Sequence, residues 1–110
     1  MQAFSAHEQR FGVHAGDVET SMMLALAPER VTMSAAQNFN SAATQRAAHY
    51  NLLGDGRSVK LGWHMQDYNP QGAAGDASDA SALKGRALVQ EAGTQLAVLL
   101  RELVAFTPLV

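Results

Sequence analysis

The longest run of regularly spaced apolar residues begins at Ser78 or Asp79 and ends at Val104. Its apolar positions recur at steps of three and four, which places them on one face of an α-helix. They are Leu83, Ala87, Leu88, Ala92, Leu96, Leu99, Leu100 and Leu103. Asp79 is expected to cap the helix at its start, and Pro108 is expected to close its end. The pattern therefore predicts one long amphipathic helix in this region.

A second helix is predicted from Gly16 or Asp17 to Ala27. Here a polar stretch passes directly into the apolar run Met-Met-Leu-Ala-Leu-Ala, and Pro28 follows. Acidic and hydroxyl residues suit the first turn of a helix because free backbone N–H groups and the positive end of the helix dipole lie there. A proline after the run favours termination of the helix.

Outside these two helices the pattern of apolar residues is weaker and predicts short elements. We expect an irregular lead-in over residues 1–12, an extended piece at 31–33, one or two helical turns around 42–49, a turn at 54–58 inside a hairpin or single strand ending at Trp63, and a loop at 67–76. Two helices beside one to three short strands indicate the α/β class. Because strands need partners, we expect a single partial domain over residues 1–110, the last part of an α/β domain.

Composition and charge narrow the class of protein. Hydrophobic residues make up 47% of the chain and charged residues 16%, as in globular proteins. The formal net charge is −2 and no basic run occurs, which argues against binding to nucleic acid or to an anionic membrane. No apolar stretch reaches the roughly 18 residues of a membrane span. Without cysteine, a basic start or an apolar signal stretch, a cytoplasmic protein is expected.

The candidate chemistry lies at the start of the first predicted helix. His14, Asp17 and Glu19 bring an imidazole and two carboxylates within six positions. Such a group can bind Zn or Mn, or it can act as a general acid and base. The alternative is a capped helix with an incidental histidine. Gly16 and Asp17 are the candidate substrate-binding residues here, because Gly16 lets the backbone approach closely and the first-turn N–H groups could hold an oxyanion.

Three further features each have a functional and a structural interpretation. Trp63, followed by His64 and Asp67, could form the wall of a substrate pocket, although a single Trp is more often a core or interface residue. Gly72-x-x-Gly75-Asp76 before a helix could bind an anion, or it could be a packing turn. The leucine stripe of the long helix could pack on a sheet or on a partner.

The motif His14-Ala15-Gly16-Asp17-x-Glu19-Thr20-Ser21, with the Met/Leu/Ala run and Pro-Glu after it, resembles the signature of the creatininase (creatinine amidohydrolase) family. Two further segments are similar to the family's Gly-x-x-Gly-Asp loop and its closing Lys-Gly helix. They are Gly72–Ala77, and Ala82 with Lys84-Gly85-Arg86-Ala87-Leu88. The resemblance implies the C-terminal part of a creatininase-like α/β/α domain.

By function, the resemblance implies a metal-dependent hydrolase of the C–N bond in a small or cyclic amide. His14 would transfer the proton, and Glu19 would orient His14 or reach the metal. The family's Glu-x-His-Gly and Asn-Gly-His motifs, which supply most metal ligands, do not occur in this sequence. We therefore expect no activity from the chain alone, and either a homo-oligomer or a separate N-terminal half as partner. The alternative is a non-catalytic module that pairs through its apolar helix face.

Overall fold

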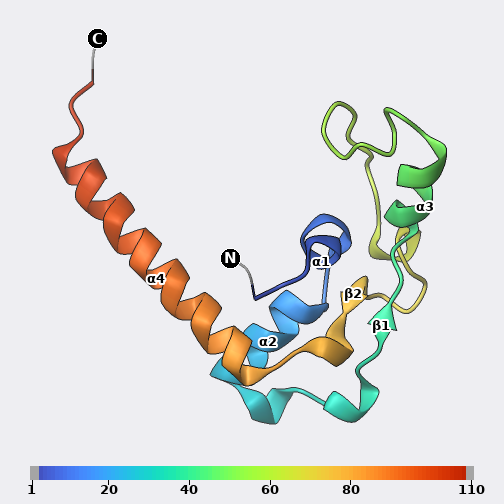
Figure 1. Ribbon diagram of the computed structural model, residues 1–110, viewed down its shortest axis with the longest axis horizontal. Helices are drawn as coiled ribbons and strands as arrows, with labels where there is room; N and C mark the ends of the chain where they lie inside the picture. The colour runs from blue at the N-terminus through green and yellow to red at the C-terminus, as the bar shows by residue number, and fades with distance from the viewer. Residues whose placement is uncertain (1–2, 109–110) are drawn as a thin grey trace.

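The computed structural model describes residues 3–108. Its helices are α1 (Ala6–Phe11), α2 (Asp17–Leu26), α3 (Ala42–His49) and α4 (Ala82–Ala105), and its strands are β1 (Asn38–Phe39) and β2 (Gly75–Asp76). Short 3₁₀ turns lie at Pro28–Arg30, Met33–Ala35, Met65–Asp67 and Ala77–Asp79. Figure 1 shows α1, α2 and the small sheet at the centre, α3 on one side and α4 leaving on the other. The predicted α/β class is confirmed.

Both main helices are confirmed. Helix α2 begins at Asp17 and ends at Leu26, within a residue of the prediction. Helix α4 begins at Ala82, later than predicted, because Ser81 and not Asp79 is its cap. The Ser81 hydroxyl accepts a hydrogen bond from the Lys84 N–H at 3.2 Å, whereas Asp79 ends the preceding 3₁₀ turn. The helical turns expected around residues 42–49 are confirmed as α3.

The predicted lead-in over residues 1–12 is wrong where the structure describes it, because residues 6–11 form α1. Residues 1–2 lie outside the described part. Ser5 caps α1 by accepting a hydrogen bond from the Glu8 N–H at 3.0 Å. A six-residue helix is unstable in isolation, so its stability depends on contacts with distant parts of the chain. Sequence periodicity does not show such contacts.

The strands do not form where they were predicted. β1 and β2 pair antiparallel, with Asn38 opposite Asp76 and Phe39 opposite Gly75. Residues 52–63 form no strand because their hydrogen bonds stay local: the Asp55 carboxylate accepts from the N–H groups of Arg57 and Ser58. The extended piece predicted at 31–33 forms no strand: Val31 is extended, but Met33 enters a 3₁₀ turn.

The closest packing in the molecule joins α2 to α4. Gly85 is buried, and a Cβ atom there would overlap the backbone carbonyl oxygen of Ser21. Ser21 is fully buried, and its hydroxyl accepts a hydrogen bond from the Ser81 N–H at 3.1 Å. Only a residue without a side chain permits this approach, so Gly85 fixes where the two helices cross.

The second half of α4 has no partner within the described chain. Every residue from 91 to 105 is exposed, and Figure 1 shows this half extending away from the other elements. Its leucine stripe is therefore uncovered. Among the described residues, no helix combines the length and hydrophobicity that crossing a lipid bilayer requires.

Candidate functional site

The residues of the His14–Ser21 motif are held in place by the carboxylate of Glu8, which the sequence pattern did not single out. Glu8, on α1, is 6% exposed. Its Oε1 accepts a hydrogen bond from the Asp17 N–H at 2.8 Å, and its Oε2 accepts one from the Asp76 N–H at 3.0 Å. One side chain thus joins α1, the first turn of α2 and β2. Because Glu8 occupies the Asp17 N–H, this one group is not available to an oxyanion, and the oxyanion role of the other first-turn N–H groups stays a prediction.

The two glycine-containing motifs meet at this carboxylate. A Cβ on Gly75 would lie 2.7 Å from the Gly16 Cα and 2.8 Å from the Glu8 Oε1. Gly75 has a φ of +144°, which side chains rarely adopt. Gly16 therefore serves close backbone packing here. A role for Gly16 in substrate binding stays a prediction.

Backbone pairing with the second motif positions His14. The His14 N–H donates to the Ala74 carbonyl oxygen at 3.2 Å, and the Ala74 N–H donates to the His14 carbonyl oxygen at 2.9 Å. Ala15 follows with a φ of +57°, a left-handed conformation that costs a residue with a side chain about 1 kcal/mol. This conformation turns the chain from the backbone pairing of His14 with Ala74 into the start of α2.

The structure brings His14 and Glu19 together, as the sequence predicted. The His14 Nδ1 lies 3.4 Å from the Glu19 Oε2. The same Oε2 accepts a hydrogen bond from the Ala15 N–H at 2.6 Å, which holds the carboxylate against the strained turn. Both side chains are about half exposed, at 57% and 48%. The pair is thus ordered by the backbone and still open to a small molecule.

His14 and Glu19 line a hollow of about 330 Å³, which we call the His14–Glu19 hollow. Its other lining residues are Ala15, Thr20, Met23, Arg30, Val31, Thr32, Met33, Ala35, Ala36 and Ala77. The volume lies at the lower end of the range of about 300–1,000 Å³ for small-molecule sites. The wall is mostly apolar, with one imidazole, one carboxylate and the Arg30 guanidinium, and it suits a small ligand with a few polar groups.

Asp17, predicted to contact substrate, is buried beneath this region instead of lining the hollow. It is 2% exposed; its Oδ1 accepts from the Ser21 hydroxyl at 2.9 Å, and its Oδ2 pairs with the Lys84 Nζ at 2.6 Å. Burial alone would lower the pKa of Lys84, but the hydrogen bond and charge of Asp17, with those of Asp79, raise it above its ordinary value. Lys84 therefore stays protonated at neutral pH and links α4 to α2.

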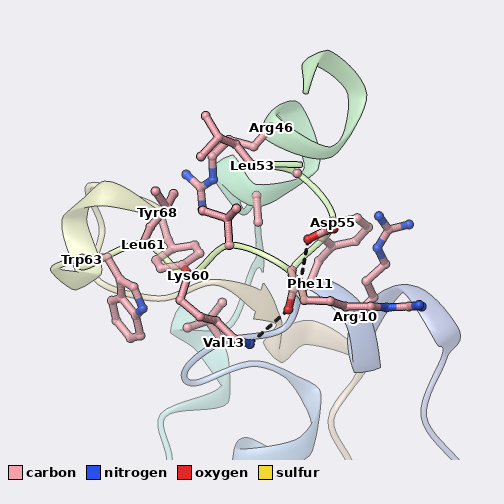
Figure 2. Close-up of a pocket in the computed structure, with 15 residues that line it drawn as sticks. Arg10, Phe11, Val13, Arg46, Leu53, Asp55, Lys60, Leu61, Trp63 and Tyr68 are labelled. Carbon is pink, nitrogen blue, oxygen red and sulfur yellow. Dashed lines mark hydrogen bonds between the residues drawn. The ribbon is translucent and has the colours of Figure 1, made fainter. Parts of the chain in front are cut away.

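Trp63 does not share a hollow with His14. It is 50% exposed and meets Tyr68 edge to face, with ring centroids 4.8 Å apart. Both rings line a separate hollow of about 430 Å³ between α1, α3 and the loop before Trp63 (Figure 2). A pocket-wall role for Trp63 remains a prediction, and it concerns this second hollow.

The described residues do not form a metal site by themselves. No group of three or more His, Cys, Asp or Glu side chains is placed to hold an ion in the part of the chain that the structure describes. His14 and Glu19 offer two donors, whereas a catalytic zinc usually takes three protein ligands. Glu19 as a metal ligand therefore needs donors from elsewhere.

Comparisons with known proteins agree with the motif resemblance. The creatininase family model, described as creatinine amidohydrolase, matches residues 1–100. No curated protein matches the chain. The chain is similar to the crystal structure of a Bacteroides fragilis protein whose assignment as a creatinine amidohydrolase is provisional, with a TM-score of 0.68 and 25% identity. The match covers 98% of this chain and 39% of that chain, so this chain spans well under half of its structural relative.

Proposed function

Because the chain belongs to the creatininase family of hydrolases, we propose that it serves the hydrolysis of a C–N bond in a small or cyclic amide. The observation that carries the proposal is the His14–Glu19 pair, 3.4 Å apart at the edge of a 330 Å³ hollow. An imidazole beside a carboxylate is a common arrangement for proton transfer near neutral pH. The volume and apolar wall of the hollow suit a small amide.

In this proposal, His14 protonates the leaving nitrogen. The Glu19 Oε2, held by the Ala15 N–H, favours the imidazole tautomer with its proton on Nδ1. The Nε2 atom is then the site that exchanges a proton with the substrate. Hydrolysis adds water across the C–N bond: the carbon gains the oxygen, the bond breaks and the nitrogen gains a proton. His14 takes a proton released by the attacking water and gives one to that nitrogen.

The family is generally metal-dependent, and we propose zinc or manganese as the metal. Glu19 is the carboxylate of this hollow that could reach it, and the remaining ligands come from outside the described residues. A separate polypeptide with the N-terminal half of the fold would supply them. The chain alone should then bind metal weakly and hydrolyse nothing measurable.

The test compares the chain alone with the chain completed by a polypeptide that carries Glu-x-His-Gly and Asn-Gly-His. Turnover of creatinine and small lactams is followed with zinc or manganese added. We expect no turnover from the chain alone and metal-dependent turnover from the mixture. His14→Asn in the mixture should lower kcat by about 10²–10⁴-fold, the usual contribution of a general acid or base. Glu19→Gln should also lower kcat, because Glu19 orients His14 and could reach the metal.

His49→Asn is the matched control, since His49 is exposed on α3 and hydrogen-bonds only its own helix. It should leave turnover unchanged. Robust metal-dependent turnover by the purified chain alone would contradict a metal site whose ligands come from two polypeptides. A His14→Asn mixture as active as the unmodified one would contradict the role of His14.

A second candidate function is supported by the exposure of α4. Leu96, Leu99, Leu100 and Leu103 are each about half exposed, at 49–59%, and lie on one helix face. Large uncovered apolar faces usually mark association sites. In this alternative the chain is a non-catalytic module that pairs with a second copy of itself through the α4 face. The oligomeric state of the purified chain in solution tests this alternative.

A further inference from the structure

The larger hollow, separate from His14, has a distinct chemical character. It measures about 430 Å³ and lies between α1, α3 and the loop that leads to Trp63 (Figure 2). Four of its lining side chains are cationic: Arg10, Arg46, Arg57 and Lys60. One carboxylate, Asp55, also lines it. We call it the cationic hollow.

This concentration of positive charge stands out against the whole chain. The chain has eight Lys and Arg residues and a formal net charge of −2, yet half of its cations line this one hollow. In the described part of the chain, none of the four forms a side-chain ion pair; the pairs that occur involve His14 and Lys84. Asp55 is occupied by the turn, where its Oδ1 accepts from the N–H groups of Arg57 and Ser58 at 2.8 and 3.0 Å. The hydrogen bonds of the turn and the nearby Arg57 charge hold the pKa of Asp55 below its ordinary value, so Asp55 offsets part of the Arg57 charge. The charges of Arg10, Arg46 and Lys60 are therefore the ones available to a ligand.

Two of the cations are held in place by aromatic rings. The Arg46 guanidinium carbon lies 5.0 Å from the Tyr68 ring centroid, and that of Arg10 lies 4.7 Å from the Phe11 ring centroid. These cation–π contacts restrict the guanidinium groups before any ligand arrives, which lowers the entropy lost on binding. The Lys60 Nζ donates to the Gly56 carbonyl oxygen at 3.1 Å, which holds the loop as the wall of the hollow.

The rim of the hollow is apolar and partly exposed. Leu53, Val59, Leu61 and Trp63 are exposed by 36–50% although they line it. Figure 2 shows Trp63 and Tyr68 together at one side of the hollow, with Arg46 above Tyr68. A planar ring placed against Trp63 would cover this apolar surface, while an anionic group on the same molecule would reach the cations.

We propose that the cationic hollow binds a small organic phosphate that carries a planar ring, such as a nucleoside monophosphate. A phosphate monoester carries about 1.5–2 negative charges and three acceptor oxygens, which matches several cations better than one carboxylate does. Stacking of a base on aromatic side chains is a common and sequence-tolerant source of affinity in proteins that bind nucleic acid. The volume falls within the range of small-molecule sites. The residues are not those of the proposed amide hydrolysis.

The test uses the only tryptophan of the chain as the probe. The full chain is titrated with AMP at low salt, and Trp63 fluorescence and heat are both recorded. We expect a saturable change in both. Adenosine, which lacks the phosphate, and inorganic phosphate, which lacks the ring, should each bind at least about 10-fold more weakly, the factor that corresponds to about 1.4 kcal/mol.

Arg46→Gln and Lys60→Gln should each weaken AMP binding by about 10-fold, the effect of losing one charge-assisted hydrogen bond. Lys60 is exposed in a loop, so its variant should fold even if the Arg46 variant does not. Arg101→Gln, on the far half of α4, is the matched control and should bind as the unmodified chain does. His14→Asn should also bind normally, which separates this proposal from the proposed hydrolysis.

Three results would overturn the proposal. The first is the absence of saturable fluorescence change and heat with AMP. The second is unchanged AMP binding in Lys60→Gln. The third is inorganic phosphate binding as tightly as AMP, which would exclude recognition of the ring.

Discussion

Glu8 joins three elements of the molecule, although the sequence pattern did not single it out. Its two carboxylate oxygens accept backbone hydrogen bonds from the starts of α2 and β2, and glycines at positions 12, 16 and 75 leave room for it. Hydrogen bonds to a charged group are worth about 1.5–3 kcal/mol each, and an unpaired buried donor costs a comparable amount. The local order of the His14–Glu19 pair therefore depends on a side chain outside it.

Glu8→Gln should lower the free energy of unfolding by about 2–3 kcal/mol. A glutamine side chain offers one acceptor oxygen where the structure needs two, so its NH₂ group would face a backbone N–H. Chemical denaturation followed by circular dichroism measures the loss. Glu29→Gln is the matched control, because Glu29 is exposed and its carboxylate has no hydrogen bond in the described chain. An equal effect of both substitutions would show that Glu8 does not hold the motifs together.

At the scale of elements, the crossing of α2 and α4 depends on one glycine. Gly85→Ala should cost more than about 2 kcal/mol, because the new methyl group overlaps the Ser21 carbonyl oxygen and forces the helices apart. Gly93→Ala, two turns later on the same helix, is the matched control. A Cβ at Gly93 meets nothing within 4 Å, and alanine favours a helix over glycine by about 1 kcal/mol.

Thermal and urea unfolding of the two variants should therefore shift in opposite directions. The Gly93 variant should be more stable than the unmodified chain, and the Gly85 variant less stable. If both were stabilised, close packing at the helix crossing would be refuted.

Long periodic elements could be predicted from the sequence, and short ones could not. α2 and α4 show helical spacing over 10 and 24 residues, so local signals specify them. α1, β1 and β2 exist because of hydrogen bonds to distant residues, such as that from the Asp76 N–H to Glu8. The proximity of His14 and Glu19 was predictable because these residues are only five positions apart and local structure brings them together. The role of Glu8 and the separation of Trp63 from His14 were not.

For the whole molecule, the uncovered half of α4 predicts self-association. The described chain extends 46 × 40 × 23 Å, and much of its length is this helix. Size-exclusion chromatography with light scattering should show a dimer or larger species. Substituting Leu99→Gln together with Leu103→Gln should yield a monomer of unchanged helicity, because both side chains are exposed within one chain.

Glu102→Gln, on the same helix but off the leucine stripe, should leave the association intact. A monomeric unmodified chain would contradict pairing through the α4 face. Metal analysis of the same peak bears on the first proposal: zinc or manganese at one ion per chain would show that ligands are completed between copies.

Hydrogen bonds and an ion pair join residues 8–21 to residues 76–84, and these contacts also determine the order in which the protein folds. Glu8 bonds Asp76, Asp17 pairs with Lys84 and Ser21 bonds Ser81, across 68, 67 and 60 positions. Closing loops of this length is entropically costly and slows folding. During synthesis α1 and α2 lack these three contacts until residues 76–84 have left the ribosome. The site at His14 therefore forms only after the segment around residues 76–85 is available.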